Sequence, residues 1–420
     1  MIKAIKGTKD LLPVDSPRWK HLESIVEKVF KTFNYKEIRT PVFEETSLFA
    51  RGIGEDTDIV GKEMYTFFDM GNTSLTLKPE MTASVVRAYN EHSLGSLQPV
   101  TKLYYIASMF RQERPQAGRL RQFNQFGAEA IGSSSPLLDV EMIQMSYNIV
   151  TDLGLKDLTI KINSLGVPKS RENYKNLLRE YLNDKQHDLS EDSRKRFDTN
   201  ILRIFDSKST GDQKILKDAP KLMDHLDDES RADFEIVKEQ LEKSHISYEV
   251  DPALVRGLDY YTKLTFEIIS SSVGAQNALC GGGRYDLLIE TLGGKPTPAT
   301  GFAAGIERIL LACENEKSFT VPDESLDIYI VRLDKTLESV VMQFADKLRK
   351  QNLSVDFDYL QRSVKAQMRE ANKMNAKFTL FVGGDEYEQE MTRLKNMESG
   401  KEEKISLNEL DKLVSKIKNE

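Results

Sequence analysis

The segment from Leu103 to Gly132 constrains the fold most, because two apolar runs there flank a single basic stretch. Residues 103–110 and 123–131 are rich in side chains that favour β-strands, and a proline and a glycine between them favour a turn. The segment therefore predicts a β-hairpin with a long polar loop. The charged residues of that loop are Arg111, Glu113, Arg114, Arg119 and Arg121.

This cluster of arginines suits a polyanion, because a guanidinium group donates two parallel hydrogen bonds to a phosphate. The alternative interpretation is a solvated loop that is rich in arginine and binds nothing. Phosphate binding is the interpretation that these residues favour.

A chain of 420 residues is expected to form two or three domains. Its 39% hydrophobic content supports packed cores, and its net charge of −7 argues against a non-specific nucleic-acid coat protein, although a local basic groove remains compatible with that charge. The two cysteines, Cys280 and Cys313, favour a reducing compartment over a disulfide scaffold. No apolar run reaches the length of a membrane span. We expect a cytoplasmic enzyme or binding protein without a membrane segment.

The N-terminal region predicts a polar arm over residues 6–13 and then a long amphipathic helix. Apolar side chains recur every three or four residues over 16–33, with Ser16 as the expected N-cap and Pro17 as the first helical residue. Residues 35–43 predict a strand whose internal proline places it at a sheet edge. This helix and strand are typical of a dimer interface, or equally of a peripheral helix packed on its own sheet.

The next segments predict a loop, a hairpin and a helix in that order. Residues 51–65 are polar and contain several glycines, so we expect a mobile loop, and residues 64–80 predict a hairpin. A helix is expected over 80–92. Glu80 at its start either stabilises the helix dipole or binds an ammonium group of a substrate.

The second half of the chain changes character twice. Residues 169–245 are charge-rich with helical spacing and predict a solvated helical insertion, whereas strand patterns return at 246–272. Three consecutive glycines within 277–294 permit close approach of a ligand, or form a bulge. Residues 301–313 predict a strand that leads into a helix carrying Arg308. After a linker at 316–325, alternating strands and helices predict a small α/β domain with a parallel or mixed sheet.

Several common catalytic motifs are absent from the sequence. There is no P-loop, no Rossmann glycine pattern, no histidine or cysteine spacing for a metal and no nucleophile elbow. The chemistry must therefore use arginines, carboxylates, tyrosines and glycines. This set suits charge stabilisation in phosphoryl or nucleotidyl transfer.

Together, these segments resemble the histidyl-tRNA synthetase family of class II aminoacyl-tRNA synthetases over essentially the whole chain. YKEIRTPVFE is similar to motif 1, FRQERPQAGRLRQF to motif 2 and GFAAGIERIL to motif 3. LVRGLDYYT and ALCGGGRYD are similar to the two motifs specific to histidine enzymes. The resemblance implies an α+β fold with an antiparallel-sheet catalytic core, a helical insertion and a C-terminal α/β anticodon-binding domain. The implied domains are residues 1–168 and 246–318 for the core, 169–245 for the insertion and 326–420 for the anticodon-binding domain.

The resemblance implies a two-step reaction, in which histidine attacks the α-phosphate of ATP and the histidyl group then passes to the 3′ end of its tRNA. Arg111 and Arg256 would act as catalytic residues on opposite faces of the α-phosphate, with Arg256 in place of a metal ion found in other class II enzymes. Mg²⁺ would accompany the ATP, and no tightly bound cofactor or protein-bound metal is implied. The residues implied for ATP binding are Arg111, Glu113, Arg119, Phe123 and Arg308.

Histidine would be held by carboxylates and tyrosines. Glu129 and Tyr261 would contact the two imidazole nitrogens, with Tyr285 lining the pocket, and Tyr260 is expected to pack beside them. The full set implied for histidine binding is Glu80, Thr82, Gln125, Glu129, Tyr261, Gly281 and Tyr285. A buried donor and acceptor matched to imidazole would reject analogues without an editing domain.

The same resemblance implies a homodimer that binds the tRNA for histidine. Arg114 and Gln116 would contact the tRNA, and the insertion would approach its acceptor stem. One alternative is a non-catalytic, synthetase-like regulatory subunit of ATP phosphoribosyltransferase, which would lack the anticodon domain and the catalytic arginines. Another is a class II synthetase for glycine, proline or threonine, which would lack the two histidine motifs.

Overall fold

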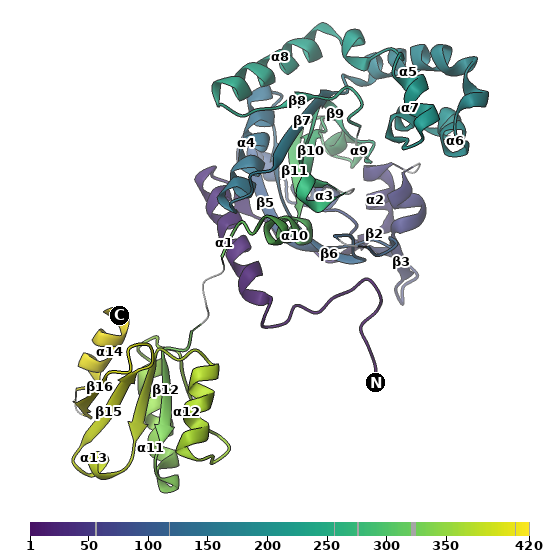
Figure 1. The fold of residues 1–420 in the computed structure, drawn as a ribbon. Helices are drawn as coiled ribbons and strands as arrows, with labels where there is room; N and C mark the ends of the chain where they lie inside the picture. The colour runs from purple at the N-terminus through teal and green to yellow at the C-terminus, as the bar shows by residue number, and fades with distance from the viewer. Residues whose placement is uncertain are drawn as a thin grey trace. The chain divides into compact units, whose positions relative to one another are not determined.

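The computed structural model describes residues 1–54, 57–116, 118–255, 257–274, 277–320, 325–407 and 409–419. The chain divides into two compact units, Met1–Val321 and Pro322–Glu420, whose elements are drawn in Figure 1. Within the described ranges, no helix combines the length and the apolar character needed to cross a lipid bilayer.

An eight-stranded sheet forms the centre of the first unit (Figure 1). Its neighbouring strands are antiparallel except for the two edge pairs, β1 with β5 and β7 with β8, which are parallel. The predicted antiparallel-sheet core is therefore confirmed. In spatial order the strands are β1 (Lys36–Glu37), β5 (Thr101–Phe110), β6 (Gln122–Ile131), β11 (Ala299–Gly305), β10 (Ala278–Arg284), β9 (Thr262–Ser270), β7 (Leu158–Ser164) and β8 (Glu249–Val250).

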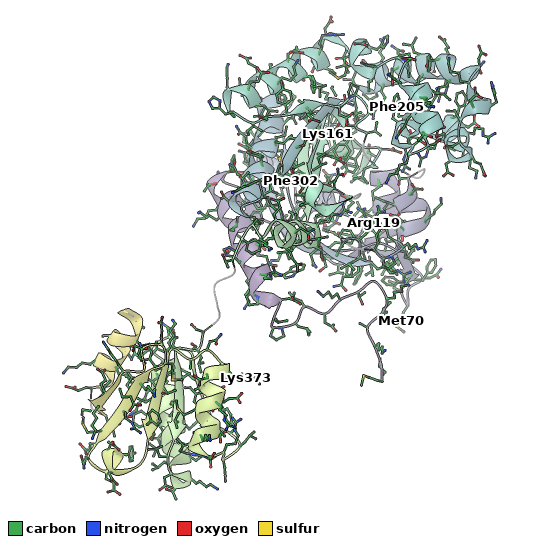
Figure 2. The ribbon with its side chains drawn as sticks, in the orientation of Figure 1. Met70, Arg119, Lys161, Phe205, Phe302 and Lys373 are labelled. Carbon is green, nitrogen blue, oxygen red and sulfur yellow. The ribbon has the colours of Figure 1, made fainter. Side chains whose placement is uncertain are left out.

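The two faces of this sheet carry different helices. On one face, Phe126 and Phe302 belong to the main core with α1 (Ser16–Thr32), α4 (Pro136–Asp152) and α10 (Ile306–Glu316), and Figure 2 labels Phe302 within the first unit. On the other face, Leu103, Tyr105 and Ile131 pack with α3 (Thr82–Glu91) and α9 (Leu288–Thr291). Because side chains alternate along a strand, the odd-numbered residues of β6 face α3. This alternation selects which side chains can form a site there.

The expected helix at 16–33 is confirmed, but its N-cap is Asp15 rather than Ser16, and Asp15 makes no side-chain capping bond. The helix buries Leu22, Val26 and Phe30 in the core of its own unit. Its apolar face is thus used internally, as in the second of the two alternatives. The strand expected over 35–43 is in fact two short edge strands in different sheets, β1 and β2 (Phe43–Glu45).

The prediction of a mobile loop over residues 51–65 was wrong in part. The helix α2 (Thr46–Ile53) extends into it, and one turn of π-helix covers Ile59–Glu63; Glu55 and Asp56 lie outside the described residues. Phe49 and Ile53 are buried in a small apolar cluster, so tertiary packing overrides the glycine content. The predicted hairpin is confirmed as β3 (Tyr65–Phe68) and β4 (Ser74–Leu77), which form a three-stranded sheet with β2.

The insertion is helical, as expected. Its helices are α5 (Pro168–Asn183), α6 (Glu191–Thr199), α7 (Thr210–Leu216) and α8 (Asp228–Lys243). Tyr174 and Leu178 of α5 belong to a small apolar core that the insertion shares with Leu165 and Tyr261, whereas Phe234 and Val237 of α8 belong to the main core. Helix α8 therefore ties the insertion to the sheet-bearing core.

The second unit contains a mixed five-stranded sheet with helices, as predicted. Strands β13, β12 and β14 are parallel, and β15 and β16 continue the sheet antiparallel. Sequence patterns missed β15, because its alternation of lysine, arginine and apolar residues is weak. The elements are β12 (Ile328–Arg332), α11 (Glu338–Arg349), β13 (Val355–Phe357), α12 (Val364–Lys373), β14 (Phe378–Val382), α13 (Asp385–Glu388), β15 (Met391–Asn396), β16 (Glu402–Ser406) and α14 (Leu410–Asn419).

Candidate active site

The predicted basic loop connects β5 to β6 and stands at the end of the central hairpin. The ten paired residues of each strand run in register from Thr101 opposite Ile131 to Phe110 opposite Gln122. Arg111 and Arg121 close the base of the loop, since the amide of Arg111 donates to the carbonyl of Arg121 at 2.9 Å. The hairpin thus presents the loop arginines from a rigid stem.

A buried carboxylate lies between two arginines of this loop. Glu113 forms ion pairs with Arg119 and, at 3.7 Å from Oε1 to Nη1, with Arg111. Arg111 also donates from Nε to the carbonyl of Pro79 at 2.9 Å, and its guanidinium lies 5.4 Å from the ring centre of Phe123. The loop is therefore ordered by its own ion pairs, and Glu113 holds both guanidinium groups.

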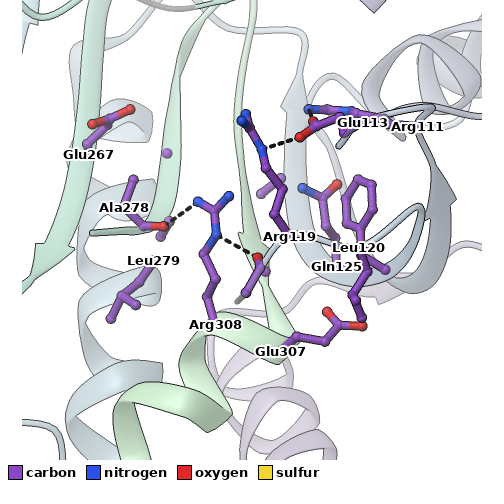
Figure 3. Close-up of a pocket in the computed structure, with 16 residues that line it drawn as sticks. Arg111, Glu113, Arg119, Leu120, Gln125, Glu267, Ala278, Leu279, Glu307 and Arg308 are labelled. Atoms are coloured by element: carbon purple, nitrogen blue, oxygen red, sulfur yellow. Dashed lines mark hydrogen bonds and ion pairs between the residues drawn. The ribbon is translucent and has the colours of Figure 1, made fainter. Parts of the chain in front are cut away.

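A third arginine reaches the loop from α10. Arg308 donates from Nε to the carbonyl of Gly118 at 3.1 Å and from Nη1 to that of Ala278 at 2.9 Å (Figure 3). Burial, followed by the charge of Arg119, lowers the pKa of Arg308. Two guanidinium groups brought together in this way favour an anion between them, since the anion relieves their mutual repulsion.

These arginines line a cavity of about 260 Å³ between β6, β10 and α10. Figure 3 shows Arg119 and Arg308 pointing into the same space, with Gln125 and Glu267 on its walls. The remaining residues that line the cavity are Arg111, Glu113, Gly118, Leu120, Phe123, Ala278, Leu279, Cys280, Gly281, Ala303, Gly305 and Glu307. The structure thus brings together every residue expected to bind ATP, from the β5–β6 hairpin and from α10.

A second group of polar side chains surrounds Glu129 on the same face of β6. Glu129 is 1% exposed. Its Oε1 accepts from the hydroxyl of Thr82 at 2.8 Å and from that of Tyr105 at 3.4 Å, and its Oε2 accepts from the hydroxyl of Tyr285. Burial raises the pKa of Glu129 to about 8, against the effect of these hydroxyl donors. The site holds a carboxyl group whose charge depends on pH near neutrality.

Two glycines make room for this carboxyl group and its tyrosine. A Cβ on Gly301 would lie 1.8 Å from Oε2 of Glu129, and one on Gly127 would lie 2.4 Å from the hydroxyl oxygen of Tyr105. Gly301 of β11 lies opposite Glu129 of β6. Gly127 of β6 lies opposite Tyr105 of β5. The small residues of these strands therefore shape the pocket.

Glu80 lies at the start of α3, beside the Glu129 group. Its two carboxylate oxygens accept from the backbone amides of Thr82 and Ala83 at 2.7 and 2.8 Å. This arrangement caps the helix, as the dipole argument predicted. Each oxygen keeps a further lone pair, so capping leaves Glu80 able to accept from a ligand.

The tyrosines form a chain of rings. The Tyr260 ring lies 4.7 Å from that of Tyr261 and 5.6 Å from that of Tyr285. The ring of Tyr260 therefore packs against those of both Tyr261 and Tyr285, as expected. The carbonyl of Tyr261 also accepts from Arg171 of the insertion at 2.8 Å, which links the insertion to the pocket.

The structure also shows functional residues that sequence reasoning missed. Tyr105 contacts Glu129, and the only signal for it was its place in the same alternation as Leu103 and Met109. Glu307 accepts from the backbone and side-chain amides of Asn124 at 2.9 to 3.0 Å, which fixes α10 against β6. Glu307 lies within the segment similar to motif 3, but no pattern in the sequence pointed to its contact with Asn124.

Two of the expected residues lie outside this arrangement. Arg114 and Gln116 are exposed on the loop, away from the cavity lining. Arg256 lies outside the described residues. Among the residues that the structure describes, no group of three or more histidine, cysteine, aspartate or glutamate side chains could hold a metal ion.

Known proteins resemble this chain over its full length. A family model for histidyl-tRNA synthetase matches residues 7–309, and one for an anticodon-binding domain matches residues 327–417. The chain is 46% identical to a histidine–tRNA ligase from Halothermothrix orenii and 45% identical to one from Caldanaerobacter subterraneus subsp. tengcongensis, with 99% of each chain covered in both cases. A crystal structure of apo S. aureus histidyl-tRNA synthetase is similar with a TM-score of 0.83 and 41% identity, and all of both chains is covered.

Proposed function

The chain belongs to the histidyl-tRNA synthetase family, and on this premise we propose that it acts as a histidine–tRNA ligase. It activates histidine with ATP to form histidyl-adenylate and pyrophosphate, and it then transfers the histidyl group to the 3′ end of its tRNA. The observation that carries this proposal is the cavity in which Arg111, Arg119 and Arg308 meet, on the same sheet face as the buried carboxyl of Glu129.

The arginines bind the triphosphate and stabilise the charge that develops on it. Arg111 acts at the α-phosphate and Arg308 at the γ-phosphate, with Arg119 between them. Because these groups are already held by Glu113 and by backbone carbonyls, they need not reorganise as negative charge grows. Phe123, which lies against Arg111, would stack with the adenine. Arg256 is proposed as the second catalytic arginine on the strength of the family resemblance alone.

Histidine binds around Glu129. An N–H of its imidazole donates to this carboxylate, while Tyr261 and Tyr285 enclose the ring beside Gly281. Gln125 supports this placement, because its buried Oε1 accepts no hydrogen bond from the described residues and is available to a substrate donor. Glu80 and Thr82 at the start of α3 complete the site at the α-amino group of the substrate.

Mg²⁺ enters with ATP as part of the substrate. It prefers oxygen ligands, keeps several of its waters and binds through one or two carboxylates plus phosphate oxygens. Glu267 on the cavity wall supplies a carboxylate of the kind that Mg²⁺ binds. The chain's own contribution is therefore to orient the phosphates with arginines.

The remaining partners follow from the other parts of the chain. The unit after Pro322 binds the anticodon, the exposed Arg114 and Gln116 contact the acceptor end, and the insertion approaches the acceptor stem. We propose the functional domains 1–168 with 246–318, 169–245 and 326–420, in a protein that works in the cytoplasm.

A homodimer is supported by an exposed apolar patch on the three-stranded sheet. Phe43 and Phe67 pack against each other at 6.2 Å between ring centres while both stay exposed. Val42 and Phe68 are exposed beside them, and so is Met70 after β3 (Figure 2). Exposed apolar side chains that pack together, as those of Phe43 and Phe67 do, mark protein interfaces.

Histidine-dependent exchange between ATP and pyrophosphate, run beside a panel of other amino acids, tests the activity without tRNA. Exchange with histidine alone supports the proposal. Exchange with another amino acid would favour a synthetase of different specificity. No exchange with any amino acid would favour the regulatory-subunit alternative, against which the arginine cavity and the anticodon-binding domain both argue. Arg256→Ala should abolish exchange while histidine binding, measured by calorimetry, persists.

A further inference from the structure

Gly7 of the N-terminal arm forms hydrogen bonds with the base of the basic loop. The carbonyl of Gly7 accepts from the amide of Arg121 at 2.7 Å and from that of Gln122 at 3.3 Å. These two amides lie where the loop ends and β6 begins. Among residues 1–14, only Gly7 and Thr8 are half-buried and the others are exposed. The arm's attachment to its unit is therefore concentrated at this point.

Arg121 relays this contact to the arginine cavity. Its amide is held by Gly7, while its carbonyl accepts from the amide of Arg111 at 2.9 Å. Its side-chain Nε donates to the carbonyl of Glu113 at 3.3 Å, and Glu113 forms the ion pairs with Arg111 and Arg119. Arg121 thus connects the arm to Arg111, Glu113 and Arg119 of the proposed ATP site.

Only glycine fits at the contact. Gly7 has a φ of +93°, in the left-handed region, and a Cβ there would lie 2.8 Å from Cγ of Arg121 and 2.8 Å from Cγ of Pro115. Any side chain at position 7 would push the arm away from the loop or displace the two residues that it meets. The close approach of the Gly7 carbonyl to two amides is therefore built into the sequence.

We infer that the arm is a positioning element for the basic loop, and that Gly7 is its positioning residue. By fixing the backbone of Arg121, Gly7 sets the distance between Arg111 and Arg119 and so the fit of the loop to a triphosphate. The inference rests on the proposed function in one respect, that the loop arginines bind ATP. A displacement of about 1 Å at such a site can cost up to about 100-fold in rate.

Gly7→Ala tests this inference in the full chain. The KM for ATP in the exchange reaction should rise about 10-fold or more. The KM for histidine should stay within about twofold, because Glu129 lies near the opposite end of β6 from Gln122. The melting temperature should stay within about 2 °C, because the arm is mostly exposed. Deleting residues 1–8 should have the same selective effect on ATP.

Gly400→Ala is the matched control. Gly400 has a φ of +72° and nothing within 4 Å of an added Cβ, so the control introduces backbone strain without a clash. It should leave both KM values unchanged. An unchanged KM for ATP in Gly7→Ala would overturn the inference. So would a parallel change in both KM values and in the melting temperature, because that pattern indicates general destabilisation.

Hydrogen exchange separates this inference from the proposed function. In Gly7→Ala, the amides of Arg111 and Arg121 should exchange faster than in the parent chain, while the amides of β11 should not change. If the parent chain catalyses no exchange of pyrophosphate, the proposed function fails. Faster amide exchange in the variant would still support the contact between arm and loop, and unchanged amide exchange would overturn it.

Discussion

The hydroxyl of Thr82 donates a 2.8 Å hydrogen bond to Oε1 of Glu129, joining the first turn of α3 to the C-terminal half of β6. Both oxygens of Glu80 accept from amides of the same helical turn. The start of α3 therefore binds the Glu80 carboxylate through backbone amides and the Glu129 carboxyl through the hydroxyl of Thr82. These hydrogen bonds stabilise both acidic groups in the buried pocket.

Glu129→Gln should raise the KM for histidine about 100-fold, because a charge-assisted hydrogen bond to the imidazole is lost while the shape of the side chain is kept. The KM for ATP should change little, since Glu129 does not line the arginine cavity. Steady-state pyrophosphate exchange with each substrate varied in turn measures both values. An equal rise in the two KM values would remove Glu129 from the histidine pocket.

The stability of the free protein should depend on the charge of Glu129. Because burial raises its pKa to about 8 in the folded state, from 4.5 in an unfolded chain, the folded state keeps a proton that the unfolded state releases between these values. This contribution to stability is complete below about pH 4.5 and is lost as the pH rises towards about 8. Glu129→Gln should reduce the resulting fall in melting temperature between pH 5 and pH 8. A fall of the same size in both proteins would contradict the assignment.

Gly301→Ala should impair histidine binding more than ATP binding. The added methyl group would lie 1.8 Å from a carboxylate oxygen of Glu129 and 2.6 Å from the backbone oxygen of Ala128, so the carboxyl group must move. We expect the KM for histidine to rise about 10-fold or more. Gly61→Ala is the control, since nothing lies within 4 Å of its added methyl group. Wild-type kinetics in Gly301→Ala would show that the Glu129 carboxyl has room to relax.

Arg284→Met should destabilise the protein by about 3–5 kcal/mol, because it leaves a buried carboxylate unpaired. Arg284 is 1% exposed and donates to Asp139 at 3.0 Å, and to the carbonyls of Ser133 and Ser135. Burial raises the pKa of Asp139 to about 6. Urea denaturation measures the loss. The double variant Arg284→Met, Asp139→Leu should recover part of it, and no recovery would mean that the carbonyl contacts of Arg284 matter more than its ion pair.

Arg114→Ala should weaken tRNA binding without affecting adenylate formation, because this side chain is exposed on the loop and lies outside the cavity. If Arg114 contacts a phosphate, the slope of log affinity against log salt should fall in magnitude by about 1. Filter binding across a salt series measures this slope. Arg179→Ala, a change at a half-buried residue of α5, provides a comparison within the insertion. A lower rate of pyrophosphate exchange in Arg114→Ala would instead place its side chain at the ATP site.

The sequence alone determined the elements whose signals are local. The β5–β6 hairpin followed from two β-prone runs around a turn, and α1 followed from apolar residues at helical spacing. The clustering of arginines in the loop was visible in the sequence and led to the prediction of a phosphate site. Local chemistry sufficed there because strand alternation, turn residues and helical periodicity act between neighbours in the chain.

Tertiary structure alone decided which of these residues meet. Tyr105 reaches Glu129 only because β5 and β6 pair in one register, and Gly301 makes room for that carboxyl only because β11 lies against β6. The contact of Gly7 with Arg121 joins residues more than 100 positions apart. The register of strand pairing and the close approach of distant backbones depend on the packing of the whole sheet, so no local pattern in the sequence records them.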